Sequence, residues 1–437
     1  MGRPLAWLPA ITDVEDHEPE PCRNQGVHMD DAPRWIGNRE HACGQLDGPC
    51  PGGGKPMMWM LWMALGWAGD WPDWLGPNRD ARSPEDISRG FGSASVLWRS
   101  GVGLGYAGSV LQNGTVWTTG TDERGDWLYA LNATDGALKW RHRLDRPYQD
   151  SMGFEGTRAT PVLAGDVVVA LSGEGTLVVV KRDTGARVWS VDLVKTYGGV
   201  RPQWGYSGTP LVQDGVIYVA AGGAAGHALL ALRLTDGSLI WHAGDDGAAY
   251  SSPVMATLAG TTQVVAFVSG GAVGLEPATG RELWRFPWET SYDVNAATPL
   301  LLGDNRVFIA SGYGSGGVAL RVTQSEGIFR AEQLWRSKRM KNRMATSVLY
   351  KGTLYGFNES RLTALDVSNG EELWGQDGFG RGTVLGAGDD VVVLGENCEL
   401  ALIRTDRKAF RRIGNLRHDV SAEPCWTVPS LSDGVLV

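Results

Sequence analysis

The chain has 437 residues, 43% of them hydrophobic, with 61 glycines and 19 tryptophans. Its formal net charge of −9 argues against a nucleic-acid partner, which requires a basic face. A membrane-spanning helix needs about 20 apolar residues. The apolar run at residues 57–68 is shorter than this, so we expect no transmembrane span.

The N-terminal part of the chain does not read as a folded domain. Residues 1–56 lack both alternating and helical periodicity, so we predict a disordered leader or a mis-assigned extension. The apolar run 57–68 fits the h-region of a signal peptide, with translation starting at Met57 or Met58. A buried N-terminal helix is the alternative. The signal predicts a periplasmic or extracellular protein, and we expect no lipid anchor because no cysteine follows the run.

An N-terminal extended segment, residues 69–94, precedes a series of repeats. Five windows share a strand, a turn in which Asp, Thr or Asn precedes Gly, and a second strand that ends in Trp. Gly stands four residues before Trp in each window. These docking pairs are Gly136 and Trp140, Gly185 and Trp189, Gly237 and Trp241, Gly280 and Trp284, and Gly370 and Trp374.

A large aromatic side chain at one fixed place in every repeat suits packing between neighbouring sheets, so we expect all five tryptophans to be buried there. Trp98 and Trp335 extend the series without the Gly. Successive tryptophans lie about 40–50 residues apart, which fits one four-stranded propeller blade per repeat.

A second hairpin precedes each docking window and often opens with Thr-Pro or Ser-Pro. The eight starts are Ser109, Thr160, Thr209, Ser252, Thr298, Ser347, Thr383 and Thr427. We therefore predict an all-β chain whose residues 95–437 form an eight-bladed β-propeller. The last blade is expected to be incomplete. Residues 426–437 supply two strands, residues 96–98 are expected to supply the outer strand, and a third strand is missing, as if the chain were clipped.

The docking windows resemble the pyrroloquinoline-quinone-type (PQQ-like) propeller repeats, whose hallmark is Gly-x-x-x-Trp. Residues 71–80, Trp-Pro-Asp-Trp-Leu-Gly-Pro-Asn-Arg-Asp, also resemble the mature N-terminus of a bacterial subgroup of that family. The same repeat occurs in quinoprotein alcohol dehydrogenases and in the outer-membrane assembly propeller BamB. This chain lacks the adjacent cysteine pair of the dehydrogenases and the lipid-attachment cysteine of BamB.

Propellers bind ligands where loops lead into the innermost strands, at the mouth of the central channel. Polar and aromatic residues in these loops form a candidate binding site, although such side chains can also simply fill the channel. The candidates are Arg158, Trp204, Tyr206, Tyr250, Asp293, Asn295, Arg343, Arg381 and Trp426.

Three weaker signals remain. Asp293 and Asn295 offer oxygen ligands but are too few to hold Ca²⁺, and no histidine pair has metal spacing, so we predict no metal site. Cys398 and Cys425 are the only cysteines of the repeat region, and a single disulfide between them is possible. A basic stretch is expected to be a solvated loop; it comprises Arg336, Lys338, Arg339, Lys341 and Arg343.

The sequence shows no recognisable catalytic constellation. We therefore expect an exported, non-enzymatic scaffold that binds a protein or cell-envelope partner and needs no cofactor. The alternative, which the resemblance implies, is a quinoprotein dehydrogenase that uses pyrroloquinoline quinone with Ca²⁺.

Overall fold

The computed structural model describes residues 69–89, 91–416 and 424–437. The predicted leader at 1–56 and the predicted signal peptide at 57–68 lie outside these residues. Within the described ranges, no helix is long and apolar enough to cross a membrane.

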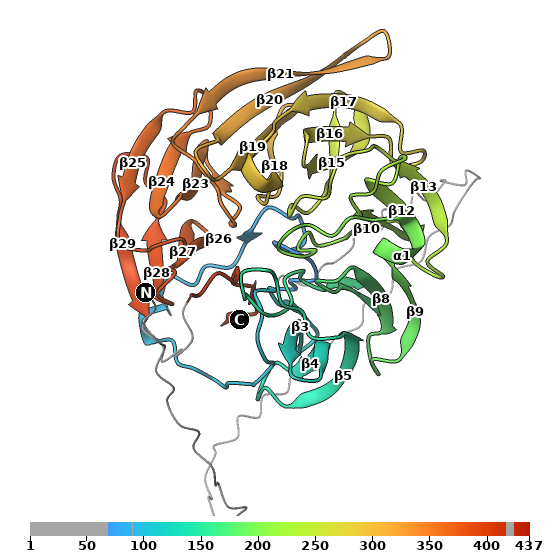
Figure 1. The fold of residues 1–437 in the computed structure, drawn as a ribbon. Coiled ribbons are helices and arrows are strands. Elements are labelled where there is room, and N and C mark those ends of the chain that lie inside the picture. Colours follow the sequence, from blue (N-terminus) through green and yellow to red (C-terminus); the bar gives the residue numbers. More distant parts are fainter. Residues whose placement is uncertain (1–68, 90, 417–423) are drawn as a thin grey trace, which may run out of the picture. The chain divides into compact units, whose positions relative to one another are not determined.

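The described residues form eight β-sheets that succeed one another around a ring (Figure 1). Six sheets have four antiparallel strands, one has five strands, and one has two. This arrangement confirms the predicted all-β, eight-bladed propeller with an incomplete last blade. The helical elements described are short: α1 (Leu193–Tyr197), η1 (Phe91–Ser93) and η2 (Ser291–Asp293).

Each four-stranded blade is built from consecutive strands, the first innermost and the last outermost. Blades one to three are β2 (Val110–Gln112), β3 (Thr115–Asp122), β4 (Gly125–Asn132) and β5 (Leu138–Asp145); β6 (Val162–Ala164), β7 (Val167–Leu171), β8 (Thr176–Lys181) and β9 (Arg187–Asp192); and β10 (Leu211–Gln213), β11 (Val216–Ala220), β12 (Leu229–Arg233) and β13 (Leu239–Ala243). Blades four to six are β14 (Val254–Leu258), β15 (Thr261–Val268), β16 (Gly271–Leu275) and β17 (Glu282–Pro287); β18 (Leu300–Gly303), β19 (Arg306–Ser311), β20 (Gly316–Ser325) and β21 (Ile328–Ser337); and β22 (Val348–Tyr350), β23 (Thr353–Asn358), β24 (Arg361–Asp366) and β25 (Glu372–Gln376).

The last two blades depart from this pattern. Blade seven adds a parallel inner strand, β1 (Arg82–Ser83), to β26 (Thr383–Ala387), β27 (Asp390–Leu394), β28 (Leu400–Arg404) and β29 (Arg412–Leu416). Blade eight consists of β30 (Leu431–Ser432) and β31 (Val435–Leu436). Residues 96–98, the predicted outer strand of this blade, form no strand.

The turns follow from local sequence. In the β2–β3 turn, Asn113 and Gly114 have φ values of 50° and 67°. In the β10–β11 turn, Asp214 and Gly215 have φ values of 51° and 76°. Asn-Gly and Asp-Gly tolerate this left-handed backbone, and two such residues make the tight hairpin that matches strand twist.

At most boundaries, a tryptophan joins one blade to the next at the periphery. The Trp189 indole lies against Gly237 of the following blade, and its Nε1 donates a hydrogen bond of 2.8 Å to the Leu234 carbonyl. A Cβ added to Gly237 would lie 2.8 Å from the ring, so the glycine provides the space. The same arrangement joins Trp98 to Gly136, Trp140 to Gly185, Trp241 to Gly280, and Trp335 to Gly370.

Two tryptophans face blades that lack the docking glycine. Trp284 turns toward its own blade, where its Nε1 donates to Gln263 Oε1 at 2.6 Å. Trp374 donates to the Asp406 carbonyl at 2.7 Å and packs edge-on against Phe410, with ring centroids 5.8 Å apart.

Burial of the docking tryptophans is unequal, contrary to the uniform burial expected from the sequence. Trp241 and Trp284 are buried, whereas Trp140, Trp189 and Trp374 are partly exposed. Trp284, at 3% exposure, is the most buried of the five because its indole turns into its own blade.

Hydroxyl groups join the blades near the channel axis. The side-chain oxygen of Thr209 accepts from the Thr160 amide at 3.1 Å, and that of Ser252 accepts from the Thr209 amide at 2.9 Å. Thr346 accepts from the Thr298 amide in the same way at 3.0 Å. The Thr or Ser that opens a hairpin therefore ties its blade to the previous one.

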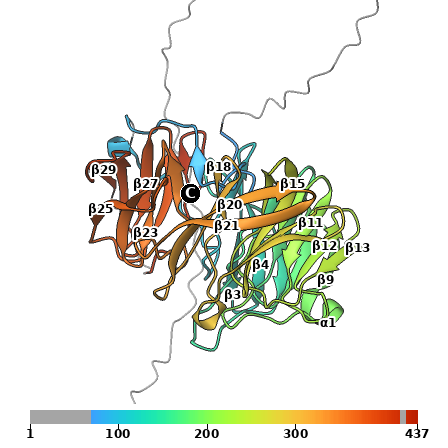
Figure 2. The same cartoon turned by 90° about the horizontal axis from the view of Figure 1, so that it is seen from above.

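The N-terminal segment crosses the middle of the ring and contacts most of the inner strands (blue in Figures 1 and 2). Trp71 pairs with Leu111 of blade one in an antiparallel bridge. Trp74 Nε1 donates to the Thr298 hydroxyl at blade five at 2.9 Å. The Ala81 carbonyl accepts from the Gly386 amide of blade seven at 2.8 Å.

Arg79 anchors this segment in the interior. The residue is 5% exposed, and its guanidinium forms a two-pronged ion pair with Asp73, at 2.8 and 2.7 Å. It also donates to the backbone carbonyls of Pro210 and Pro253, which open the inner strands of blades three and four. One buried cation thus joins the segment to two blades.

Replacing a docking tryptophan is expected to loosen one blade boundary. Trp189→Ala should lower the free energy of unfolding by about 3–5 kcal/mol, because the indole packing and its hydrogen bond are both lost. Denaturant unfolding measures the effect. Leu239→Ala on the outermost strand of the following blade, at a side chain that is 38% exposed, serves as the control and should have little effect. Equal effects of the two changes would contradict the docking account.

Arg79→Ala is expected to destabilise the fold by about 3–5 kcal/mol, because it leaves Asp73 without its partner and two buried carbonyls without donors. Arg79→Lys should recover only part of the loss, since an ammonium cannot reproduce the planar fork. Thermal unfolding of both variants, with Arg89→Ala at an exposed position as the control, is the measurement. A wild-type melting temperature for Arg79→Ala would show that the segment is not anchored there.

Candidate functional site

The candidate site lies at one end of the ring, which we call the channel mouth. Strand direction alternates within each blade, so loops that lead into the innermost strand and loops between the second and third strands open at the same end. The loops that open at the channel mouth include residues 104–106, 148–158, 200–206, 289–295, 312–315, 338–345, 359–360, 379–383, 395–399 and 424–427.

Aromatic side chains line one part of this rim. Trp204 packs against Tyr250 and Tyr292, with ring centroids 5.7 and 6.2 Å away. Tyr292 in turn meets Tyr313 at 6.2 Å. Tyr292 is 65% exposed, so this row of rings presents apolar surface to solvent.

A second aromatic group lies around Trp426. Its ring is 5.6 Å from that of Tyr106 and 6.1 Å from that of Phe154. The indole Nε1 donates to Glu396 Oε1 at 3.1 Å. The preceding residue, Cys425, forms a disulfide with Cys398, so the bridge that the sequence left open fixes the backbone beside Trp426.

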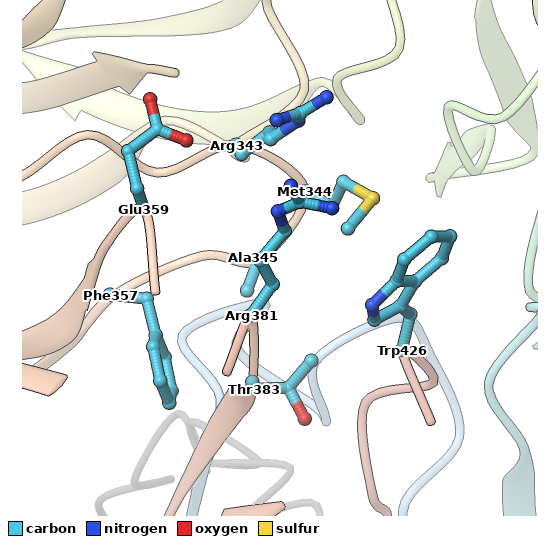
Figure 3. A pocket seen from close by; sticks show the side chains of 9 residues that line it. Arg343, Met344, Ala345, Phe357, Glu359, Arg381, Thr383 and Trp426 are labelled. Carbon is cyan, nitrogen blue, oxygen red and sulfur yellow. The ribbon is translucent and has the colours of Figure 1, made fainter. Parts of the chain in front are cut away.

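A small pocket lies between blades six, seven and eight. Figure 3 shows Arg343, Met344, Arg381 and Trp426 around it, with Glu359 nearby. It contains about 10 Å³ of free space, enough for about one water molecule. The site is therefore a rim of side chains rather than a deep cavity.

The arginines of the rim differ in their partners. Arg158 forms an ion pair of 3.0 Å with the buried carboxylate of Asp150 and stacks over Tyr148 at 4.8 Å. Arg381 lies 3.8 Å from Glu396. Arg343 instead stacks over Tyr313 at 4.2 Å and donates to its hydroxyl at 2.8 Å.

Two predicted site residues do not belong to the rim. Tyr206 is 2% exposed and donates to the Ala221 carbonyl at 2.8 Å, and burial raises the pKa of its hydroxyl. Asn295 is fully buried; its amide donates to the Val268 carbonyl at 2.8 Å, and its oxygen accepts from the Ser311 hydroxyl at 2.7 Å. Both side chains satisfy backbone and core groups instead of facing a ligand.

Of the remaining candidates, the structure brings Arg343, Arg381 and Trp426 together and places Trp204 against Tyr250. Tyr250 is largely buried beneath Trp204, and burial raises the pKa of its hydroxyl to about 12. Arg158 is held at the rim by Asp150.

The two oxygen donors considered for Ca²⁺, Asp293 and Asn295, do not face a common site. Asp293 is exposed at the rim, whereas the oxygen of Asn295 is already engaged in the interior, so the two cannot share a metal ion. Among the described residues, no group of three or more His, Cys, Asp or Glu side chains is placed to hold a metal ion.

The sequence reasoning missed several rim residues, including Tyr106, Phe154, Tyr313, Met344 and Glu359. Tyr313 and Glu359 lie in loops between the second and third strands. The strand order of a four-stranded blade places these loops at the mouth, so their position in each repeat could have identified them as part of the site. Tyr106, Phe154 and Met344 lie in loops that lead into innermost strands.

Comparisons with known proteins agree with the fold. Residues 124–376 match the family described as outer membrane protein assembly factor BamB. The curated BamB of Yersinia pestis is 31% identical over 116 residues, which cover 26% of this chain and 28% of that protein. The chain thus aligns with little more than a quarter of this relative's length.

Two solved structures extend the likeness. BamB from Moraxella catarrhalis has a TM-score of 0.50 at 19% identity, over 69% of this chain and 83% of that one. The quinohemoprotein alcohol dehydrogenase ADHIIG from Pseudomonas putida HK5 has a TM-score of 0.59 at 14% identity, over 84% and 75%. These likenesses confirm the propeller fold and the resemblance to PQQ-like repeat proteins.

Removing the disulfide is expected to free the part of the rim that carries Trp426. In Cys398→Ser combined with Cys425→Ser, backbone amides of residues 424–427 should exchange hydrogen faster, because the covalent link to Cys398 is lost and non-covalent contacts such as the bond from the Cys425 amide to the Glu396 carbonyl remain. Hydrogen–deuterium exchange with mass spectrometry measures this. Residues 254–258 in blade four provide the internal control, and unchanged exchange at 424–427 would show that the bridge does not fix the rim.

Proposed function

The chain belongs to the family described as outer membrane protein assembly factor BamB, and from this membership we propose that it is an exported, non-enzymatic scaffold that binds a protein partner in the cell envelope. The channel mouth is the binding surface in this proposal. The family supports an envelope role, and the geometry of the rim supports binding.

The observation that carries the proposal is the apolar surface exposed at the mouth. Met152 is 63% exposed, Tyr292 65%, Tyr313 37% and Met344 37%. Exposed aromatic and methionine side chains gathered at one place favour a protein interface, because a soluble surface seldom tolerates them without a partner.

Side chains of this apolar surface are held in place by contacts with one another. Trp204 Nε1 lies 3.4 Å from Met152 Sδ, and Trp204 is wedged against Tyr250. Side chains that are already held in place lose little entropy on binding, which favours affinity. The arginines Arg158 and Arg381 are paired with carboxylates of the same rim. Such pairs are more typical of a binding surface than of a site that transfers protons.

The disulfide supports export. A bridge between Cys398 and Cys425 forms and persists in oxidising compartments such as the periplasm or the extracellular space. This agrees with the signal peptide that we predict at residues 57–68.

A photo-crosslinking amino acid at position 292 tests the proposal in the native host. We expect a crosslinked adduct with a specific envelope protein, because this side chain is the most exposed aromatic group described at the mouth. Position 213, the exposed last residue of β10 at the opposite end of blade three, serves as the matched control. Adducts of equal yield at both positions, or none at position 292, would contradict binding through the mouth.

A further inference from the structure

A basic stretch, residues 336–343, lies next to the channel mouth. It leaves β21 and leads into blade six. Arg336 stacks over Trp288, which follows β17 of blade four, whereas Lys338 and Arg343 contact Gly314 and Tyr313 in the β19–β20 loop of blade five. The sequence suggested only a solvated loop. Two features of the structure distinguish it from an ordinary charged surface.

The first feature is the lack of carboxylate partners. Rim arginines elsewhere, such as Arg158 and Arg381, lie within ion-pair distance of an acid. Within the part of the chain that the structure describes, no carboxylate lies within 4.0 Å of the charged groups of Arg336, Lys338 or Arg343. A chain with a net charge of −9 therefore carries, at its mouth, three positive side chains that are not engaged in ion pairs with its described carboxylates.

The second feature is that these cations are held in place. The Arg336 guanidinium stacks over Trp288 at 4.2 Å, and that of Arg343 stacks over Tyr313 at the same distance. Lys338 Nζ donates to the Gly314 carbonyl at 2.6 Å. Cation–π stacking leaves the edge of a guanidinium free to donate to a carboxylate, and it reduces the entropy lost on binding.

Apolar surface adjoins the cations directly. Tyr313, on which Arg343 rests, meets Tyr292 at 6.2 Å. Met344 is exposed next to Arg343, as Figure 3 shows. A ligand that reaches the cations therefore also contacts aromatic and thioether groups.

We propose that this surface, formed by Arg336, Lys338, Arg343, Tyr292, Tyr313 and Met344, binds an acidic segment of the partner protein whose carboxylates alternate with aromatic or aliphatic side chains. The carboxylates would meet the stacked guanidinium groups, and the apolar side chains would cover Tyr292, Tyr313 and Met344. The inference rests on the proposed function and adds the chemistry of the partner. A membrane surface is the weaker candidate, because a protein of net negative charge is repelled by anionic lipid outside one small patch.

Binding of defined peptides tests the proposal. The probe is a fluorescein-labelled 12-residue peptide in which Glu and Asp alternate with Phe and Leu; the comparison peptide has Lys in place of every acid. Fluorescence anisotropy should show saturable binding of the acidic peptide that weakens as salt is added, because the charges are near the surface. The basic peptide should bind at least about tenfold more weakly.

Charge reversal locates the binding surface. Lys338→Glu combined with Arg343→Glu should weaken binding of the acidic peptide by about tenfold or more. The same change of charge at the opposite end of blade seven, Lys408→Glu with Arg411→Glu, should leave it unchanged; both control side chains are exposed. Lys338→Gln with Arg343→Gln is the milder variant, and all three should retain the wild-type melting temperature.

The outcomes separate this inference from the proposed function. Equal binding of the acidic and basic peptides, no loss in the charge-reversal variant, or binding to phosphatidylglycerol vesicles without binding of the acidic peptide would each overturn the inference. A specific crosslink at position 292 in any of these cases would leave the proposed function standing. Absence of that crosslink together with salt-sensitive peptide binding would instead show that the surface binds acidic segments but not an envelope protein.

Discussion

The propeller depends on one repeated contact, the indole of one blade resting on the bare backbone of the next blade's turn. The contact needs two residues at once: a flat side chain long enough to cross the boundary, and a glycine whose missing Cβ admits the ring. The indole nitrogen then finds a carbonyl in that same turn, as Trp189 does at Leu234. The flat indole ring provides a large contact area with the next blade, and its hydrogen bond fixes the rotation of one blade relative to its neighbour.

The boundaries without the glycine show how far this rule can vary. Trp284 turns back into its own blade because the next hairpin, β20–β21, has ten-residue strands and no docking turn. β21 lies against β17 instead, and Phe329 and Ala331 pack on the cluster that contains Trp284. Packing of a long hairpin thus replaces docking where the motif is missing.

Much of the fold could be predicted from the sequence because docking pairs and hairpin starts recur at a steady interval. The interior segment could not, since Arg79 binds the carbonyls of Pro210 and Pro253, and backbone acceptors leave no sequence signature. The site was predicted less well. Asn295 and Tyr206 lie in loops of the expected kind, but their polar atoms serve buried backbone groups. Loop position alone does not reveal which way a side chain turns.

The N-terminal segment has a consequence for how the chain reaches its final state. Residues 71–83 contact inner strands from blade one to blade seven, and Glu85 accepts from the Asp433 and Gly434 amides near the other end of the sequence. Among the described residues, those that are synthesised first can therefore complete their packing contacts only after nearly all the later residues have been synthesised. Contacts so distant in sequence slow folding. A chain synthesised in order would carry its central segment unplaced until the last blade arrives, which favours folding after synthesis is complete.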